Sequence, residues 1–257
     1  MYKRQKRWLV PLIEIGVLGF IAFKAHKLIV SYRKQESASS DFYSVIKNLS
    51  VANFGTLIGP FLATELSVFY YGLLVWKKKK LDSNEYSYHK KSGTITLFIA
   101  FIGIILMETL VLHAVLVKTY PIFAWILTGL SLYTLIQLFG ILKSVPHRPI
   151  TFKENTLYLR FGIMNETEVP LNAIDFIERT SKDFEKDKNI RYLSPIGSLE
   201  GHNLILHMHK EQTLTGIYGF QKKYRAIALS LDSLDDFESQ LIQSQQTSKE
   251  SMAADLN

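Results

Sequence analysis

The longest apolar region of the chain runs from Gly93 to Leu142. It reads GTITLFIAFIGIILMETLVLHAVLV over 93–117 and PIFAWILTGLSLYTLIQLFGIL over 121–142, with only Lys-Thr-Tyr between them. A helix needs about 20 mostly apolar residues to cross the ~30 Å hydrocarbon core of a bilayer, and each run is long enough. We therefore expect two transmembrane helices, 93–117 and 121–142, joined by a short loop.

Two further apolar runs precede this pair. Val51–Trp76 is long enough by the same measure, and Trp8–Phe23 extends to Val30 if its two lysines snorkel to the interface. The basic start MYKRQKR is typical of a signal peptide, but Glu14 and the lack of a small-residue cleavage motif favour an uncleaved anchor. The sequence thus predicts a four-helix transmembrane bundle in residues 1–146, with spans at about 8–30, 51–76, 93–117 and 121–142.

The distribution of charge predicts the orientation of these helices. Residues 1–146 carry a net charge of +10 and residues 147–257 a net charge of −3. The loop after the third span has only Lys118, whereas four basic residues follow the second span: Lys77, Lys78, Lys79 and Lys80. Because cytoplasmic loops are enriched in Lys and Arg, we expect a multi-pass cell-membrane protein with both termini in the cytoplasm. The four lysines are a stop signal and candidate contacts for lipid headgroups. The charge lies between apolar runs, so no nucleic-acid partner is expected.

Residues 147–244 have a sequence pattern typical of a small β-sheet. Apolar and polar residues alternate in Thr156–Phe161 and in Ile227–Leu231, which is typical of half-buried strands. In Asn203–His209 the residues Leu204, Leu206 and Met208 share one face. From Ser233 an apolar stripe at helical spacing predicts an amphipathic helix, and 245–257 reads as a disordered tail. These elements predict an antiparallel barrel or bent sheet whose open end the helix covers.

The order of these elements resembles the bacterial pleckstrin-homology-like (PH-like) domain joined to several membrane spans, as found in uncharacterised bacterial integral membrane proteins. The segments that carry the resemblance are Arg148–Ile150, Leu157–Gly162, Val169–Leu171 with Ile174, Asn203–Leu206, Gly216–Arg225, Ile227–Leu229 and Asp232–Phe237. The resemblance covers residues 94–243. It implies an α+β chain, a split β-barrel with a C-terminal capping helix, and a scaffold or regulatory function. It implies no ligand.

Carboxylates interrupt three of the predicted spans. Glu14, Glu65 and Glu108 each lie near the middle of a span, and His113 lies in the third. An ionised acid at the bilayer centre is costly, so these acids are expected to face the bundle interior. They form either a proton, cation or substrate site, or interhelical contacts with the hydroxyls of residues such as Thr64, Thr109 and Thr128, or with Gln137.

Motifs of enzymes are not found in this sequence. No HExxH, GxSxG or phosphate-binding glycine loop occurs, and the chain has no cysteine for a disulfide or a thiolate metal site. His202, His207 and His209 are the most metal-like group, but paired histidines on an exposed strand are more common than a metal site. We expect no metal, no cofactor and no catalytic residue.

The leading hypothesis is a non-enzymatic membrane scaffold or regulator that contacts the bilayer and a protein partner. The alternative is a small transporter or intramembrane enzyme that uses the acids.

Overall fold

The computed structural model describes residues 41–77, 79–182, 184 and 189–254. The predicted first span, about 8–30, and Glu14 within it lie outside these residues. The chain divides into two compact units, 1–67 and 68–257. In the described part, three helical stretches are long and apolar enough to cross a membrane: Phe42–Leu74, Thr94–Leu116 and Pro121–His147.

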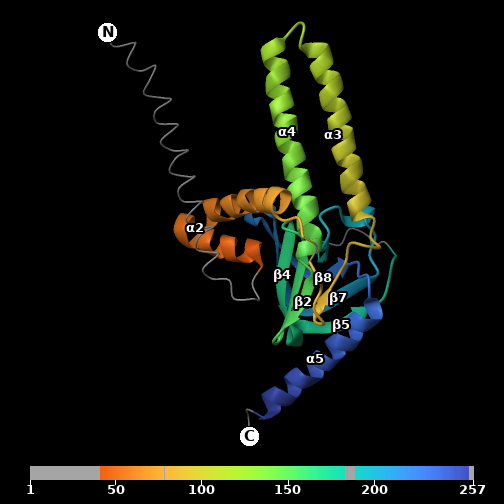
Figure 1. Ribbon diagram of the computed structural model, residues 1–257. Coiled ribbons are helices and arrows are strands. Elements are labelled where there is room, and N and C mark those ends of the chain that lie inside the picture. The colour runs from red at the N-terminus through yellow and green to blue at the C-terminus, as the bar shows by residue number, and fades with distance from the viewer. Residues whose placement is uncertain (1–40, 78, 183, 185–188, 255–257) are drawn as a thin grey trace. The chain divides into compact units, whose positions relative to one another are not determined.

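The second predicted span differs from the expected single helix over 51–76. Helix α2 (Phe42–Phe69) begins nine residues earlier and continues into one π-helical turn, η1 (Tyr70–Leu74). Gly55 interrupts it with φ 76° and ψ 178°, a conformation open essentially only to glycine. A Cβ on Gly59 would lie 2.6 Å from the Val51 Cα, although these residues would be about 12 Å apart along a straight helix. The chain therefore folds back at Gly55 into a helical hairpin, whose arms are seen in orange in Figure 1.

Helices α3 (Thr94–Leu116) and α4 (Pro121–Ser144) form a second, longer hairpin. They run side by side and rise together from the sheet (Figure 1). Pro121 starts α4 where its missing N–H costs no hydrogen bond. At about 1.5 Å per residue, the 23 residues of α3 extend about 34 Å. Large apolar side chains cover the outside, with Met107 64%, Leu110 67% and Ile122 77% exposed. Soluble proteins rarely expose an apolar surface of this extent, so the hairpin is compatible with a lipid environment.

The remaining chain forms an eight-stranded, mostly antiparallel sheet in the order β1-β2-β3-β4-β7-β8-β6, with β5 also paired to β7. The strands are β1 (Glu85–Tyr86), β2 (Ile150–Lys153), β3 (Thr156–Phe161), β4 (Asn165–Pro170), β5 (Ile174–Glu178), β6 (Ile190–Tyr192), β7 (Leu204–Gly216) and β8 (Gln221–Leu229). Short helical turns connect them: η2 (Val145–His147), η3 (Leu171–Ala173), η4 (Gly197–Leu199) and η5 (Ile217–Gly219). Among the described strands, β6 and β8 form the one parallel pair.

The alternation read from the sequence is confirmed in the core. Leu157, Leu159 and Phe161 of β3 are buried, and the residues between them are half-buried. Leu204, Leu206 and Met208 of β7 join the same core, while Ile205 packs on the opposite face. The long β7 pairs with β5 near its start and with β4 at its end, so two strands share one of its edges. The described strands form an open sheet, so the closed barrel that was one of the two predicted forms is not found.

Helix α5 (Leu234–Ala254) covers the core at the end of the chain. Phe237 and Leu241 are buried, as the helical stripe predicts, but Ile242 is 53% exposed. Asp235 and Asp236 lie in the first turn, where their negative charges interact favourably with the positive end of the helix dipole. The helix runs to Ala254 and thus into the segment 245–257 that was predicted to be a disordered tail.

Candidate functional site

The acids of the apolar helices occupy different surroundings. Glu65 is half-buried in the second arm of α2. Glu108 is exposed on α3, where it borders a shallow groove lined otherwise by apolar residues such as Gly103 and Met107. Glu14 lies outside the described residues. The convergence of the three acids therefore stays a prediction.

The hydroxyls that were expected to bind these acids have other partners. Thr64, Thr109 and Thr128 each donate a hydrogen bond to the carbonyl four residues earlier in the same helix. The polar contact between α3 and α4 is made instead by His113, whose Nδ1 lies 2.8 Å from the Thr128 Oγ1. The Trp125 ring packs edge-on against this imidazole, with ring centroids 4.9 Å apart. In the described part of the chain, His113 thus joins α3 and α4.

The lysines after the second apolar run lie at the start of a structured segment. The Lys79 Nζ is 2.6 Å from a Glu85 carboxylate oxygen, and the carbonyl oxygen of Lys77 is 2.9 Å from the His147 Nε2. Lys80 is exposed, and Lys78 lies outside the described residues. Lys77 and Lys80 therefore keep exposed side chains, while Lys79 is engaged in an ion pair.

The start of α3 is attached to the sheet by two acidic side chains. The backbone N–H groups of Lys90 and Lys91 donate to the Asp232 carboxylate over 2.9–3.2 Å, and the Lys91 Nζ reaches the Asp232 carbonyl oxygen at 2.7 Å. The Thr94 hydroxyl, in the first residue of α3, donates to Glu200. Ser92 lies beside it, with its Oγ 2.7 Å from the Thr94 Oγ1. The loop before α3 is thereby held against the sheet.

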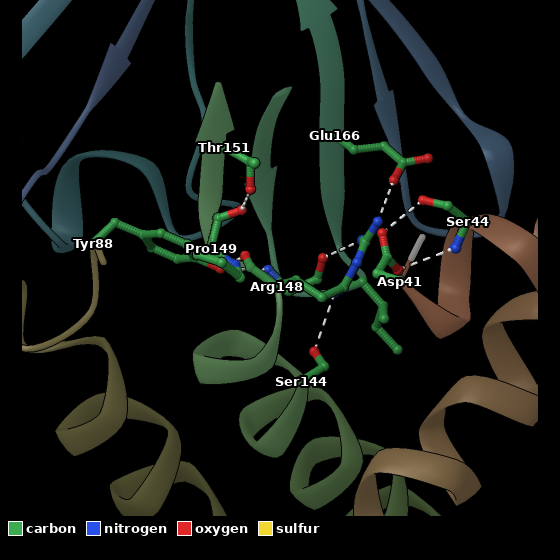
Figure 2. Close-up of polar contacts among 10 residues, drawn as sticks. Asp41, Ser44, Tyr88, Ser144, Arg148, Pro149, Thr151 and Glu166 are labelled. Carbon is green, nitrogen blue, oxygen red and sulfur yellow. Dashed lines mark hydrogen bonds and ion pairs between the residues drawn. The ribbon is translucent and has the colours of Figure 1, made fainter. Parts of the chain in front are cut away.

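The end of α4 is attached through Tyr88 and Arg148. The buried Tyr88 hydroxyl donates towards the carbonyl oxygens of Val145 (3.1 Å) and Arg148 (3.2 Å), and it accepts from the Gly162 N–H at 2.7 Å. The Ile163 N–H donates to the Oγ of Ser144, the last residue of α4, at 3.1 Å. Figure 2 shows Tyr88, Ser144 and Arg148 around this helix end.

Arg148 is fully buried at the end of α4. Its guanidinium donates to the Gly162 carbonyl, and its Nη2 lies 2.8 Å from a Glu166 carboxylate oxygen (Figure 2). A buried charge is costly unless it is paired and hydrogen-bonded, so removal of either partner would strongly destabilise this region. We call Tyr88, Arg148, Glu200 and Asp232, with the helix ends Thr94 and Ser144, the junction.

Two groups of the junction have displaced pKa values. Burial raises the pKa of Tyr88 far above its ordinary value, which keeps the phenol protonated as a donor. Burial also raises the pKa of the Glu200 carboxyl, against the opposing effect of hydrogen bonds from Ser194, Thr94 and Ser92. In both groups, burial away from water is the largest cause of the raised pKa.

Two of the three histidines proposed as a metal-like group lie beside acidic side chains. The His207 Nε2 lies 2.9 Å from a Glu178 oxygen, and its ring stacks on Phe176 with centroids 4.1 Å apart. The His209 Nδ1 lies 3.3 Å from an Asp175 oxygen. His202 is buried and packs against Tyr192. In the part of the chain that the structure describes, no three His, Asp or Glu side chains are placed to hold a metal ion.

Sequence reasoning missed the junction because most of its residues come from segments without a periodic pattern. The polar segment 82–92, predicted as part of a transmembrane domain over 1–146, adds β1 and Tyr88 to the sheet domain. The sequence offers only an alternation of Tyr86 and Tyr88 as a signal, and it is too short to predict a strand.

Comparison of the chain with family models, with curated proteins and with solved structures finds no match.

Proposed function

We propose that this chain is a non-enzymatic, integral protein of the cytoplasmic membrane, in which a PH-like sheet domain is held rigidly at the cytoplasmic end of a transmembrane hairpin. There it presents a surface for a protein partner or for the membrane surface. The junction carries the proposal. Both ends of the α3–α4 hairpin are bonded to one folded sheet, through Asp232 and Glu200 at one end and through Tyr88 and Ser144 at the other.

This attachment constrains the membrane topology. β1, which precedes α3, pairs with β2, which follows α4. Two segments of one sheet lie on the same side of a membrane, so a hairpin between them crosses it twice. Lys118 at the tip then lies on the opposite side. The lysine-rich segment before α3 supports a cytoplasmic location of the sheet, because cytoplasmic loops are enriched in Lys and Arg.

The absence of cysteine from the chain makes this topology directly testable. Single-cysteine variants Lys118→Cys, at the hairpin tip, and Lys210→Cys, exposed on β7, are treated in intact cells with a membrane-impermeant maleimide. We expect labelling of Lys118→Cys only, and labelling of both variants after the cells are lysed. Labelling of Lys210→Cys in intact cells would refute the proposed orientation. Release of the protein from membranes by alkaline carbonate would refute integral insertion.

A further inference from the structure

A groove of about 840 Å³ opens on the sheet domain between the β3–β4 turn, β6 and the β7–β8 turn. Its lining combines aromatic side chains from three segments. The rings of Phe184 and Tyr192 stack with centroids 4.7 Å apart. Phe220, the residue just before β8, is 70% exposed. A groove of this size, with apolar walls and a few polar groups, is typical of a small-molecule site.

The charged residues in the described lining of the groove are basic. Arg191 and Lys222 contribute to the lining, and no acidic residue belongs to it among the described residues. Among the described residues, the Arg191 Nε donates to the Lys223 carbonyl oxygen at 3.4 Å. The neighbouring Lys223, in contrast, pairs with Glu211 at 2.7 Å. Within the described ranges, Lys222 and the Arg191 Nη atoms have no acidic partner, so they suit an anion, and a guanidinium in particular matches a phosphate.

The groove lies at the end of the sheet from which both helices of the hairpin leave. One lining residue, Met164, directly follows Ile163, which bonds to Ser144 at the end of α4. Another, Ser194, donates to Glu200, which holds Thr94 at the start of α3. If the hairpin crosses the membrane, these contacts place the groove at the level of the lipid headgroups. The 70% exposed Leu199 on η4 adds an apolar residue at the same end.

We propose that this groove binds the headgroup of an anionic glycerophospholipid from the membrane in which the chain is embedded. The lipid phosphate lies between Arg191 and Lys222, and the glycerol and the upper acyl chains contact Phe220 and Tyr192. Inorganic phosphate has no apolar part to contact the exposed aromatic wall, whereas a lipid uses the charge and the wall together. The inference rests on the membrane insertion proposed above, because insertion brings the groove to the headgroups.

The test uses the full chain in dodecyl maltoside micelles with equal amounts of dioleoylphosphatidylglycerol and dioleoylphosphatidylcholine, and native mass spectrometry counts the bound lipids. We expect the wild-type chain to prefer the anionic lipid about thirtyfold, since two basic residues near a lipid surface contribute ~1 kcal/mol each and 1.4 kcal/mol corresponds to about a factor of ten. Arg191→Gln with Lys222→Gln should abolish the preference. Arg225→Gln with Lys210→Gln, which removes two exposed charges of β8 and β7 outside the groove, should leave it unchanged. Phe220→Ala should reduce the binding of both lipids.

Folding and alternative sites are controlled in the same measurement. Arg191→Lys with Lys222→Arg should keep the preference, which separates a loss of charge from a loss of fold. An equal preference in the wild type and the Arg191→Gln/Lys222→Gln variant would overturn the proposal, and so would its loss only when Lys77, Lys79 and Lys80 are changed to Gln. Displacement of the lipid by millimolar inorganic phosphate would instead assign the groove to a small anion. Because micelles have no sidedness, failure here is distinct from a wrong topology, which the maleimide experiment detects.

Discussion

At the scale of single residues, the junction depends on polar groups that sequence patterns do not mark. Tyr88 satisfies three backbone groups with one hydroxyl, and Asp232 satisfies two backbone N–H groups with one carboxylate. Buried polar groups left without a partner cost about 1–3 kcal/mol each, so such side chains decide whether the loop before α3 stays on the sheet.

Glu200 predicts a pH dependence of stability. Burial raises its pKa in the folded chain above the ordinary value of 4.5, so on acidification the folded state binds this proton before the unfolded state does. The contribution of Glu200 to the free energy of unfolding therefore increases as the pH falls through its raised pKa, and it levels off near pH 4.5. Glu200→Gln should flatten the pH profile of the melting temperature in this window, as measured by intrinsic fluorescence of the protein in micelles.

The matched control is Glu168→Gln, which removes an exposed glutamate of β4. This variant should retain the wild-type profile. An unchanged slope for Glu200→Gln would show that the carboxyl is as well solvated in the folded chain as in the unfolded chain.

At the scale of elements, α2 shows how two glycines redirect an apolar helix. Gly55 provides the turn, and Gly59 allows the backbones of the two arms to meet at Val51. Gly140 has a similar function in α4, because a Cβ there would lie 2.4 Å from the Val68 carbonyl oxygen. Close approach of helix backbones through small residues is the usual way in which membrane helices pack.

The α2 hairpin predicts a measurable distance. Spin labels on Lys47→Cys and Leu62→Cys should lie close together, because packed helix axes are about 8–10 Å apart, whereas a straight helix would separate these positions by about 22 Å. Gly59→Leu should move the distance distribution to longer values in pulsed EPR.

Gly129→Leu is the control for this variant, because the site of a Cβ on Gly129 has no neighbour within 4 Å. It should leave the distribution unchanged. A distance of about 22 Å in the unmodified background would rule out the hairpin.

At the scale of the whole molecule, the scaffold proposal and its alternative differ in what the acids do. If the chain is a scaffold, proteoliposomes containing it should show proton flux within about twofold of protein-free vesicles, as followed with an entrapped pH-sensitive dye. Glu65→Gln with Glu108→Gln should then change neither the flux nor the elution of the protein in gel filtration. A flux that is present in the wild type and lost in this double variant would favour a transporter over a scaffold.

The elements that could be predicted from the sequence are those whose pattern is local. The apolar runs predict α3 and α4, and the alternation of Leu157, Leu159 and Phe161 predicts a buried strand face, because length and periodicity act within one segment. Three features became visible only in the folded chain: α2 folds back at Gly55, the segment 82–92 joins the sheet, and the sheet stays open. These features depend on pairings between distant segments, such as Tyr86 with Ile150 and Tyr88 with Gly162. Such pairings form because a buried backbone group or side chain needs a partner, and a linear pattern does not show which partner will be near.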